Sequence, residues 1–195
     1  MTTPEFEVRE DPATFRFTFD QFEQMFDDGQ FQSVWNRVEL LEGRIVEMAP
    51  GSDDHSKTNA NLVVRLGMKL IEAGLTAEFG VRTDGTVRIG DYSAPEPDVY
   101  VVRNFSGRKY AAASDAVLLV EVSISTRADD LKIKIPMYAR AGVPEVWMVE
   151  PEARLIRVFR DPCQDGSWGE ARVVTEGAVT ALFSDQVRIA LADLF

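Results

Sequence analysis

Two acidic residues on apolar strands are the first candidates for chemistry in this sequence. Glu121 lies inside the run AVLLVEVSI with apolar neighbours on both sides, and Asp98 opens the run DVYVV directly after Pro97. An ionised carboxylate in an apolar strand is costly unless it is paired or bound to a cation. Because Mg²⁺ (or Mn²⁺) binds oxygen ligands and needs few protein carboxylates, the two acids predict a divalent-metal site with Asp98 and Glu121 as ligands.

Lys134 is the candidate for a cationic group beside this site. A bound divalent cation lowers the pKa of a bound water and polarises a phosphoryl oxygen. A lysine near that water would position it and offset the charge of the transition state. Asp130, Lys134 and Tyr138 are spaced i, i+4, i+8, so they share nearly one face of a predicted helix. We expect Asp130 and Tyr138 to be packing residues that orient Lys134.

In their order along the chain, these residues resemble the Uma-type restriction-endonuclease-like family of the PD-(D/E)xK nuclease superfamily. No single motif is specific, but the ordered series is, because several independent weak matches agree. The resemblance spans residues 37–160. The matching segments are VELLEGRIVEMAPGSDDH, the DxxV of DVYVV, LLVEVSISTRADDLKIK and AGVPEVWMVEP.

The resemblance implies roles for three of the candidates. Asp98 resembles the aspartate of the PD element, here preceded by Glu96-Pro97, and Glu121 resembles the acid of the (D/E)xK element. The lysine of that element would fall at Ser123, so the strand motif is broken. Lys134, on the following helix, matches the position to which the family's lysine has moved.

The resemblance also implies a fourth site residue, a fold and an activity. Glu39 resembles a further acid that joins the site from the first hairpin. The fold implied is α/β, with a restriction-endonuclease-like mixed central sheet flanked by helices. The activity implied is that of a Mg²⁺-dependent endonuclease on nucleic acid, with DNA as the expected partner. Pro136 stands two residues after Lys134 and could alter the direction in which the lysine points.

The two strand acids also have structural interpretations, which the sequence leaves open. Asp98 could simply cap a turn after Pro97. Glu121 could be the ion-pair partner of an arginine such as Arg82 or Arg103. Both acids would then stabilise the fold without taking part in chemistry.

The other two candidates and the histidine have similar alternatives. Lys134 could be a solvated helix lysine like Lys132, and Glu39 could be one more hairpin acid beside Glu42. His55 is the only histidine and could act as a general base. A lone histidine near a helix start is more often a cap or a surface residue.

Strands and helices alternate along the chain, and they must position these side chains. Thr18, then Asp53 or Asp54, then Ser125 or Thr126 can cap three predicted helices, and Gly74 and Gly142 can end the last two. The apolar positions of the second helix are Leu62, Val63, Leu66, Leu70 and Ile71. The predicted strands are VELL, RIVEM, LTAEFGVR, TVRI, DVYVV, AVLLVEVSI, VPEVWMVE, LIRVFRDP, GEARVVT and VRIAL.

The size and composition of the chain indicate one globular domain. We expect a single α/β domain over residues 1–195, with residues 1–17 as an N-terminal arm and residues 37–160 as the nuclease-like core. The N-terminus lacks the pattern of a secretory signal, and no apolar run is long enough to cross a bilayer. With Cys163 as the only cysteine, no internal disulfide can form. We therefore expect a cytoplasmic protein with no membrane partner.

The net charge of −11 restricts the functions that fit. It counts against a protein that coats nucleic acid through basic contacts to phosphate, but a nuclease brings cations to its acidic site. Two alternatives remain open. One is a catalytically inactive binding or scaffold module of the same fold, and the other is an acidic DNA mimic. A homodimer is the common arrangement for nucleases that cut both strands.

Overall fold

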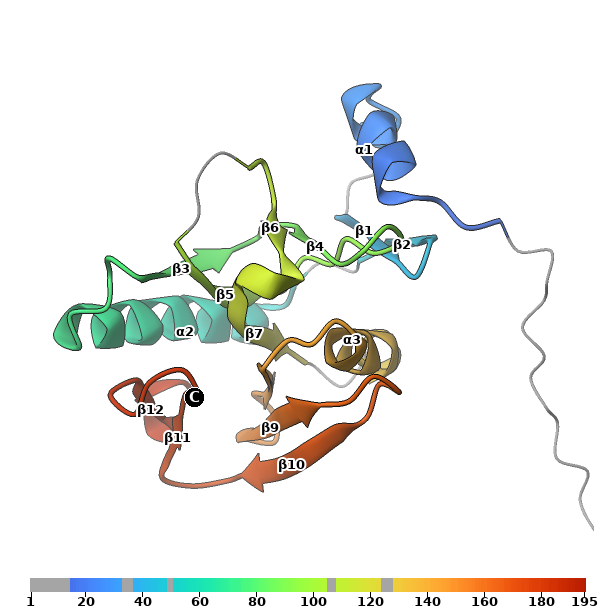
Figure 1. Ribbon diagram of the computed structural model, residues 1–195. Helices are drawn as coiled ribbons and strands as arrows, with labels where there is room; N and C mark the ends of the chain where they lie inside the picture. Colours follow the sequence, from blue (N-terminus) through green and yellow to red (C-terminus); the bar gives the residue numbers. More distant parts are fainter. Residues whose placement is uncertain (1–14, 33–36, 49–50, 105–107, 124–127) are drawn as a thin grey trace, which may run out of the picture.

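A mixed six-stranded sheet forms the centre of the molecule (Figure 1). The computed structural model describes residues 15–32, 37–48, 51–104, 108–123 and 128–195. Across the sheet the strands are β10 (Trp168–Val174), β9 (Leu155–Pro162), β8 (Glu145–Glu150), β7 (Ala116–Val122), β5 (Val99–Arg103) and β3 (Phe79–Thr83). In this sheet β7 and β8 pair in parallel, and the other neighbours are antiparallel. The predicted mixed α/β sheet is confirmed.

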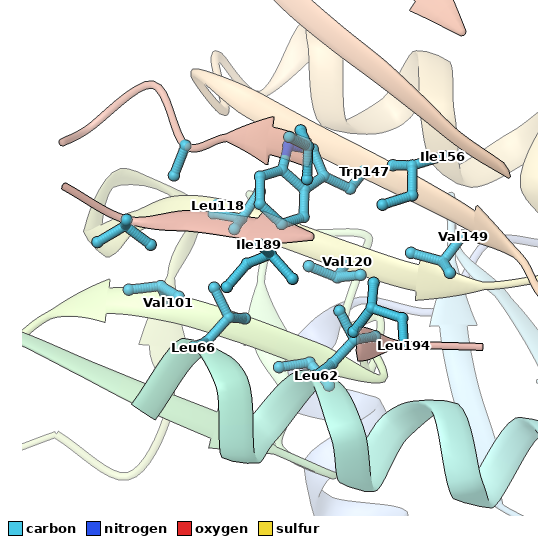
Figure 2. Packing of buried hydrophobic residues seen from close by; sticks show 14 of the residues in the cluster. Leu62, Leu66, Val101, Leu118, Val120, Trp147, Val149, Ile156, Ile189 and Leu194 are labelled. Atoms are coloured by element: carbon cyan, nitrogen blue, oxygen red, sulfur yellow. The ribbon is translucent and has the colours of Figure 1, made fainter. Parts of the chain in front are cut away.

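Two helices, α2 (Asp53–Glu72) and α3 (Ala128–Arg140), cover opposite faces of this sheet. Alternate residues of a strand point to opposite faces. In β5, Val99 and Val101 pack in the apolar cluster that contains Leu62 and Leu66 of α2. Figure 2 shows these leucines beside Val101 and the central strand residues. The neighbouring cluster contains Tyr100 and Val102 of β5 together with Met137, Tyr138 and Val143.

The predicted second helix buries fewer of its apolar residues than expected. Leu62, Leu66 and Leu70 are buried against the sheet. Ile71, which was also predicted for the apolar face, is 69% exposed, so that prediction was wrong. One row of residues spaced four apart makes the contact, and Ile71 lies outside that row.

The start of α2 differs from the prediction as well. Ser52 is the N-cap, not Asp53 or Asp54, and its hydroxyl accepts a hydrogen bond from the backbone N–H of His55 at 3.3 Å. The two aspartates lie in the first turn, where negative charge is favourable near the positive end of the helix dipole. Gly74 follows the helix with φ +68°, as predicted for a C-terminal glycine.

Helix α3 is the crossover connection between β7 and β8. Parallel strands need such a connection because a short hairpin cannot join them. Pro136 lies inside α3, and the helix continues through it to Arg140. Gly142 follows with φ +73°, as predicted. The predicted caps Ser125 and Thr126 lie outside the described residues.

A small hairpin of β1 (Val38–Leu41) and β2 (Arg44–Glu47) forms a separate sheet. Its turn residues Glu42 and Gly43 both have positive φ, 51° and 82°, which is typical of a tight hairpin turn. Leu40 forms a bridge with Ala94, whose N–H donates to the Leu40 carbonyl at 2.7 Å. The predicted hairpin is confirmed, and it is attached to the segment that leads to Asp98.

The remaining elements are one further helix and several short strands and turns of 3-10 helix. Thr18 caps α1 (Phe19–Asp27) through a reciprocal pair of hydrogen bonds with Gln21, as predicted for Thr18. Among the described helices, none is both long enough and apolar enough to span a membrane. The other short elements are β4 (Val87–Arg88), β6 (Ala111–Ala112), η1 (Ala113–Asp115), β11 (Ala178–Thr180), β12 (Arg188–Ala190) and η3 (Leu191–Asp193).

Candidate active site

The four predicted site residues come from four elements and are all buried. Glu39 lies on β1, Asp98 precedes β5, Glu121 is near the end of β7, and Lys134 is in α3. Each is at most 5% exposed. Val99 pairs with Val120 in the antiparallel ladder, so the next positions outward are Asp98 and Glu121. The pairing of β5 with β7 therefore places the two acids beside each other, at one end of these central strands.

The Lys134 ammonium bridges two carboxylates. Its Nζ lies 3.0 Å from Oε1 and 2.9 Å from Oε2 of Glu39, and 3.4 Å from both carboxylate oxygens of Glu121. The Oε2 contact of Glu39 is within ion-pair distance but lacks hydrogen-bond geometry, so it is electrostatic. Pro136 does not turn the lysine away from the acids.

Tyr138 holds the carboxylate of Glu121 from the next turn of α3. Its hydroxyl donates to Oε1 of Glu121 at 2.5 Å, and its side chain is fully buried. Lys134 and Tyr138, four residues apart, thus both contact Glu121 from one face of α3. On the other side of the cluster, the backbone N–H of Glu96 donates to Oε1 of Glu39 at 3.1 Å. The side chain of Asp130, the third predicted member of this face, lies outside the described part.

His55 joins the cluster through Asp98. Its Nε2 lies 3.0 Å from Oδ1 of Asp98, and the backbone N–H of Val122 donates to Oδ2 at 2.8 Å. His55 is buried, so its interpretation as a surface residue was wrong. The spacing of His55 and Leu62, seven residues apart on the buried face of α2, is the sequence signal for this burial. Asp98 binds the backbone of β7 rather than a turn after Pro97.

The arginines considered as partners for Glu121 lie elsewhere. Arg103 donates to Glu78 at 3.0 Å, and Arg82 donates to the carbonyl of Val81 at 3.0 Å. The described contacts of Glu121 are those with Lys134 and Tyr138. The structural interpretation of Glu121 as a partner of either arginine is therefore wrong.

Arg37 is a neighbour of the cluster that sequence reasoning missed. Its guanidinium donates to the carboxylate of Glu96 at 2.9 Å, to the carbonyl of Glu96 at 3.0 Å and to Asp84 at 2.9 Å. Glu96 in turn binds Glu39 through its N–H. Arg37 thereby fixes the segment before Asp98, and no motif in the sequence marks this role.

Burial moves two acids of the cluster toward their neutral forms. Burial raises the pKa of Glu121 to about 7; Lys134 opposes this rise, and the nearby Asp98 and Glu39 reinforce it. Burial likewise raises the pKa of Glu39 above its ordinary value, against the effect of Lys134. The cluster therefore favours the gain of positive charge.

Asp98 and Lys134 remain ionised for different reasons. Burial alone would raise the pKa of Asp98, but the hydrogen bond and charge of His55 and the N–H of Val122 outweigh it and lower that pKa. Burial would lower the pKa of Lys134, but the carboxylates of Glu121 and Glu39 outweigh it and raise that pKa. Lys134 is thus a permanent cation beside the acids.

The donor set fits a divalent cation held by two carboxylates. Mg²⁺ prefers oxygen ligands and binds through one or two carboxylates, with waters and phosphate oxygens completing its shell. Asp98 and Glu121 offer hard oxygens at adjacent positions of the sheet, and each carboxylate oxygen has further lone pairs. In the described part of the chain, no three His, Cys, Asp or Glu side chains are grouped as a metal site. Asp98 and Glu121 are the two residues that would hold such an ion.

The other residues singled out in the sequence lie apart from this arrangement or cannot be placed. Trp147 is fully buried in the core. Cys163 is a free, half-buried cysteine on the loop that follows β9. Ser123 is half-buried at the end of β7, and its backbone N–H donates to the carbonyl of Val149.

Comparisons with known proteins identify the family of this chain and a solved structure with a similar fold. The family whose model matches residues 19–192 is Uma2, described as "Putative restriction endonuclease". The fold is similar to the crystal structure of "a putative nuclease belonging to DUF820" from Anabaena variabilis. That similarity has a TM-score of 0.71 at 16% sequence identity and covers 92% of this chain and 97% of the other. No curated protein matches the sequence.

Proposed function

Since this chain belongs to the Uma2 family of restriction-endonuclease-like proteins, we propose that it is an endonuclease that depends on Mg²⁺ or Mn²⁺ and hydrolyses DNA. The observation that carries the proposal is that two buried carboxylates, those of Glu39 and Glu121, lie at the Lys134 ammonium, while the Asp98 position is next to Glu121 in the sheet. Buried carboxylates that outnumber the cations beside them are electrically balanced only when a further cation or a proton binds. A divalent cation would supply that charge and the chemistry of phosphodiester hydrolysis together.

Asp98 and Glu121 would hold the metal. When bound, the cation supplies Lewis acidity at a phosphoryl oxygen and lowers the pKa of a water molecule. His55 and the N–H of Val122 fix the orientation of the Asp98 carboxylate, and Tyr138 fixes that of Glu121. Ligands whose partners fix them in this way lose little freedom when they bind an ion.

Lys134 would act on the phosphate and on the attacking water. Because its pKa is raised, it stays protonated and offsets negative charge as it develops in the transition state. Glu39 holds the ammonium at 2.9 Å from its carboxylate. Glu39 is therefore a positioning residue in this proposal, and Lys134 is the catalytic cation.

The test is the cleavage of supercoiled plasmid DNA in Mg²⁺, with and without a chelator. We expect nicked and linear products that disappear when the chelator is added, and loss of activity in Glu121→Ala. Glu78→Ala is the matched control, since Glu78 is an exposed acid paired with Arg103 on the surface. Equal activity in Glu121→Ala and the wild type would contradict this assignment.

A second candidate function is a non-enzymatic scaffold or binding module of the same fold. The observation that favours it is that each acid of the cluster already has a partner inside the protein, while the cluster is almost closed to solvent. A scaffold of this kind would bind no Mg²⁺ or Mn²⁺ at millimolar concentration, and it would leave plasmid DNA intact at any metal concentration.

A further inference from the structure

The outer face of α2 exposes apolar side chains along the C-terminal half of the helix. Val64 is 55% exposed, Met68 45% and Ile71 69%, although the opposite face of the same helix is buried against the sheet. In Figure 1, α2 lies along one side of the molecule. Contiguous apolar surface of this kind marks an interaction site more often than scattered exposed residues do.

The residues of this outer face have the spacing of a helix–helix seam. Lys57, Ala60, Val64, Gly67 and Ile71 are separated by three, four, three and four positions. This is the heptad spacing that keeps one stripe of a helix in contact with a second helix. Within it, large residues alternate with small ones, because Ala60 and Gly67 stand between the side chains of Lys57, Val64 and Ile71.

No contact in the described part of this chain requires a glycine at position 67. A Cβ added there would meet no atom within 4 Å, and its φ is not in the left-handed region. Glycine in the middle of a helix destabilises the helix relative to alanine. A second helix that approaches closely at this point would supply the reason for a residue without a side chain.

We propose that this face binds the same face of a second copy of the chain, as an antiparallel helix pair with its two-fold axis between residues 65 and 66. Val64 then meets Gly67 of the second copy, and Ala60 meets Ile71. Each large side chain is placed against a small residue, and the two-fold axis repeats both contacts. A surface that fits itself in this way is the requirement for a two-fold dimer.

The charges at the ends of α2 select the antiparallel direction. Lys57 lies near the N-terminal end, and Glu72, which pairs with Lys69 of its own chain at 2.6 Å, lies near the C-terminal end. The residues of the seam between them, Ala60, Val64, Gly67 and Ile71, carry no charge. In the antiparallel pair, Lys57 of each copy comes within reach of Glu72 of the other. A parallel pair would instead place like charges together, so the second copy in antiparallel orientation is the occupant that fits.

The experiment measures the mass in solution by light scattering across a range of concentrations. We expect the wild type to have twice the 21.8 kDa of one chain and Val64→Glu to have 21.8 kDa. Val173→Glu is the matched control, because Val173 is a valine of similar exposure, 51%, on the edge strand β10. It should remain a dimer. A wild type that stays at 21.8 kDa, or a Val64→Glu variant that stays dimeric, overturns the proposal.

A charge exchange tests the register without disturbing the fold. Lys57→Glu should weaken the dimer, and adding Glu72→Lys should restore it. Each change places a charge that suits its end of the helix dipole. Glu72→Lys also breaks the pair with Lys69, but that pair is exposed and weak, so its loss should not unfold α2. If the double variant is no more dimeric than Lys57→Glu alone, the antiparallel register is overturned. None of these residues lies in the candidate active site, so the outcome is independent of the proposed nuclease activity.

Discussion

Glu121 is the residue on which the properties of the acidic cluster depend most. It accepts a hydrogen bond from Tyr138 and lies 3.4 Å from the Lys134 ammonium. Its position in β7 is next to that of Asp98 at the start of β5. Burial and the neighbouring acids favour its neutral form, whereas Lys134 favours its charged form. A metal ion bound by Asp98 and Glu121 would stabilise the charged form of Glu121.

Removal of the ammonium should be strongly destabilising. In the metal-free protein, Lys134→Met leaves the buried carboxylates of Glu39 and Glu121 without their cation, and breaking a buried pair in this way costs about 3–5 kcal/mol. We expect a loss of this order in the free energy of unfolding, measured by urea denaturation at pH 8. Adding Glu121→Gln to the same chain should recover part of the loss.

Lys69→Met is the control for Lys134→Met. Lys69 pairs with Glu72 on the exposed surface of α2, and such pairs contribute about 0–1 kcal/mol. If the two lysine variants lose the same stability, the buried cluster does not have the electrostatic role assigned to it.

The raised pKa of Glu121 predicts a pH dependence of the metal-free protein. Its value in the folded state is about 7, against an ordinary value of 4.5. The folded chain therefore binds more protons than the unfolded chain between these values, and this contribution to stability is lost as the pH rises through about 7. In the wild type, the free energy of unfolding should fall by on the order of 1–3 kcal/mol between pH 5 and pH 8 because of Glu121. We expect Glu121→Gln to remove this fall, measured by urea denaturation with a chelator. Parallel pH profiles of the variant and the wild type would refute it.

The sequence predicts the chemical types of this cluster better than its connections. Asp98 and Glu121 could be found because each interrupts an apolar strand, and Lys134 because it follows them on a helix. The pairing of His55 with Asp98 could not be found, since it joins residues far apart in the chain where α2 meets the start of β5. Arg37 is invisible for the same reason.

Three elements determine where the cluster forms. The end of the β5–β7 ladder supplies Asp98 and Glu121, helix α3 supplies the ammonium, and the β1–β2 hairpin supplies Glu39. Arg140 at the end of α3 also forms a close ion pair with Glu42 in the hairpin turn. The hairpin and α3 are thus joined at two points, through Lys134 and through Arg140.

The hairpin turn should be sensitive to substitution at Gly43. A Cβ there would lie 2.6 Å from the Cβ of Arg16, and φ is +82°. Gly43→Ala should therefore lose more than the roughly 1 kcal/mol of strain that a positive φ imposes on alanine. Gly90→Ala is the control, because Gly90 has φ +57° but open space around it. Urea denaturation should rank Gly43→Ala as clearly less stable, and equal losses would contradict the steric argument.

The sequence predicts which helices and strands exist better than it predicts the residues at which they begin and end. The alternation of strands and helices was confirmed, but the helix cap was assigned to Asp53 or Asp54, whereas the structure has Ser52. Cap choice depends on the exact path of the incoming chain, which composition does not contain. Pro136 was expected to be able to alter the direction of Lys134, but α3 continues through it and the ammonium still lies beside Glu39 and Glu121.

The whole molecule is acidic, and this affects how it could meet DNA. A net charge of −11 repels phosphate, so the chain cannot rely on bulk electrostatics for binding.

The sequence resemblance covers residues 37–160, whereas the family match extends over residues 19–192. The additional residues include β10, which completes the central sheet, so the resemblance covered the candidate site residues but not the full extent of the fold.

Metal binding measured by titration calorimetry is the most direct test of the central claim. We expect the wild type to bind one Mn²⁺ or Mg²⁺, and Asp98→Asn and Glu121→Gln to lose that binding at least about 10-fold. Asp91→Asn is the control, since Asp91 is an exposed acid paired with Arg88, and it should bind like the wild type. Absence of binding at millimolar metal, or wild-type binding by Asp98→Asn, would contradict the assignment of Asp98 and Glu121 as a metal centre.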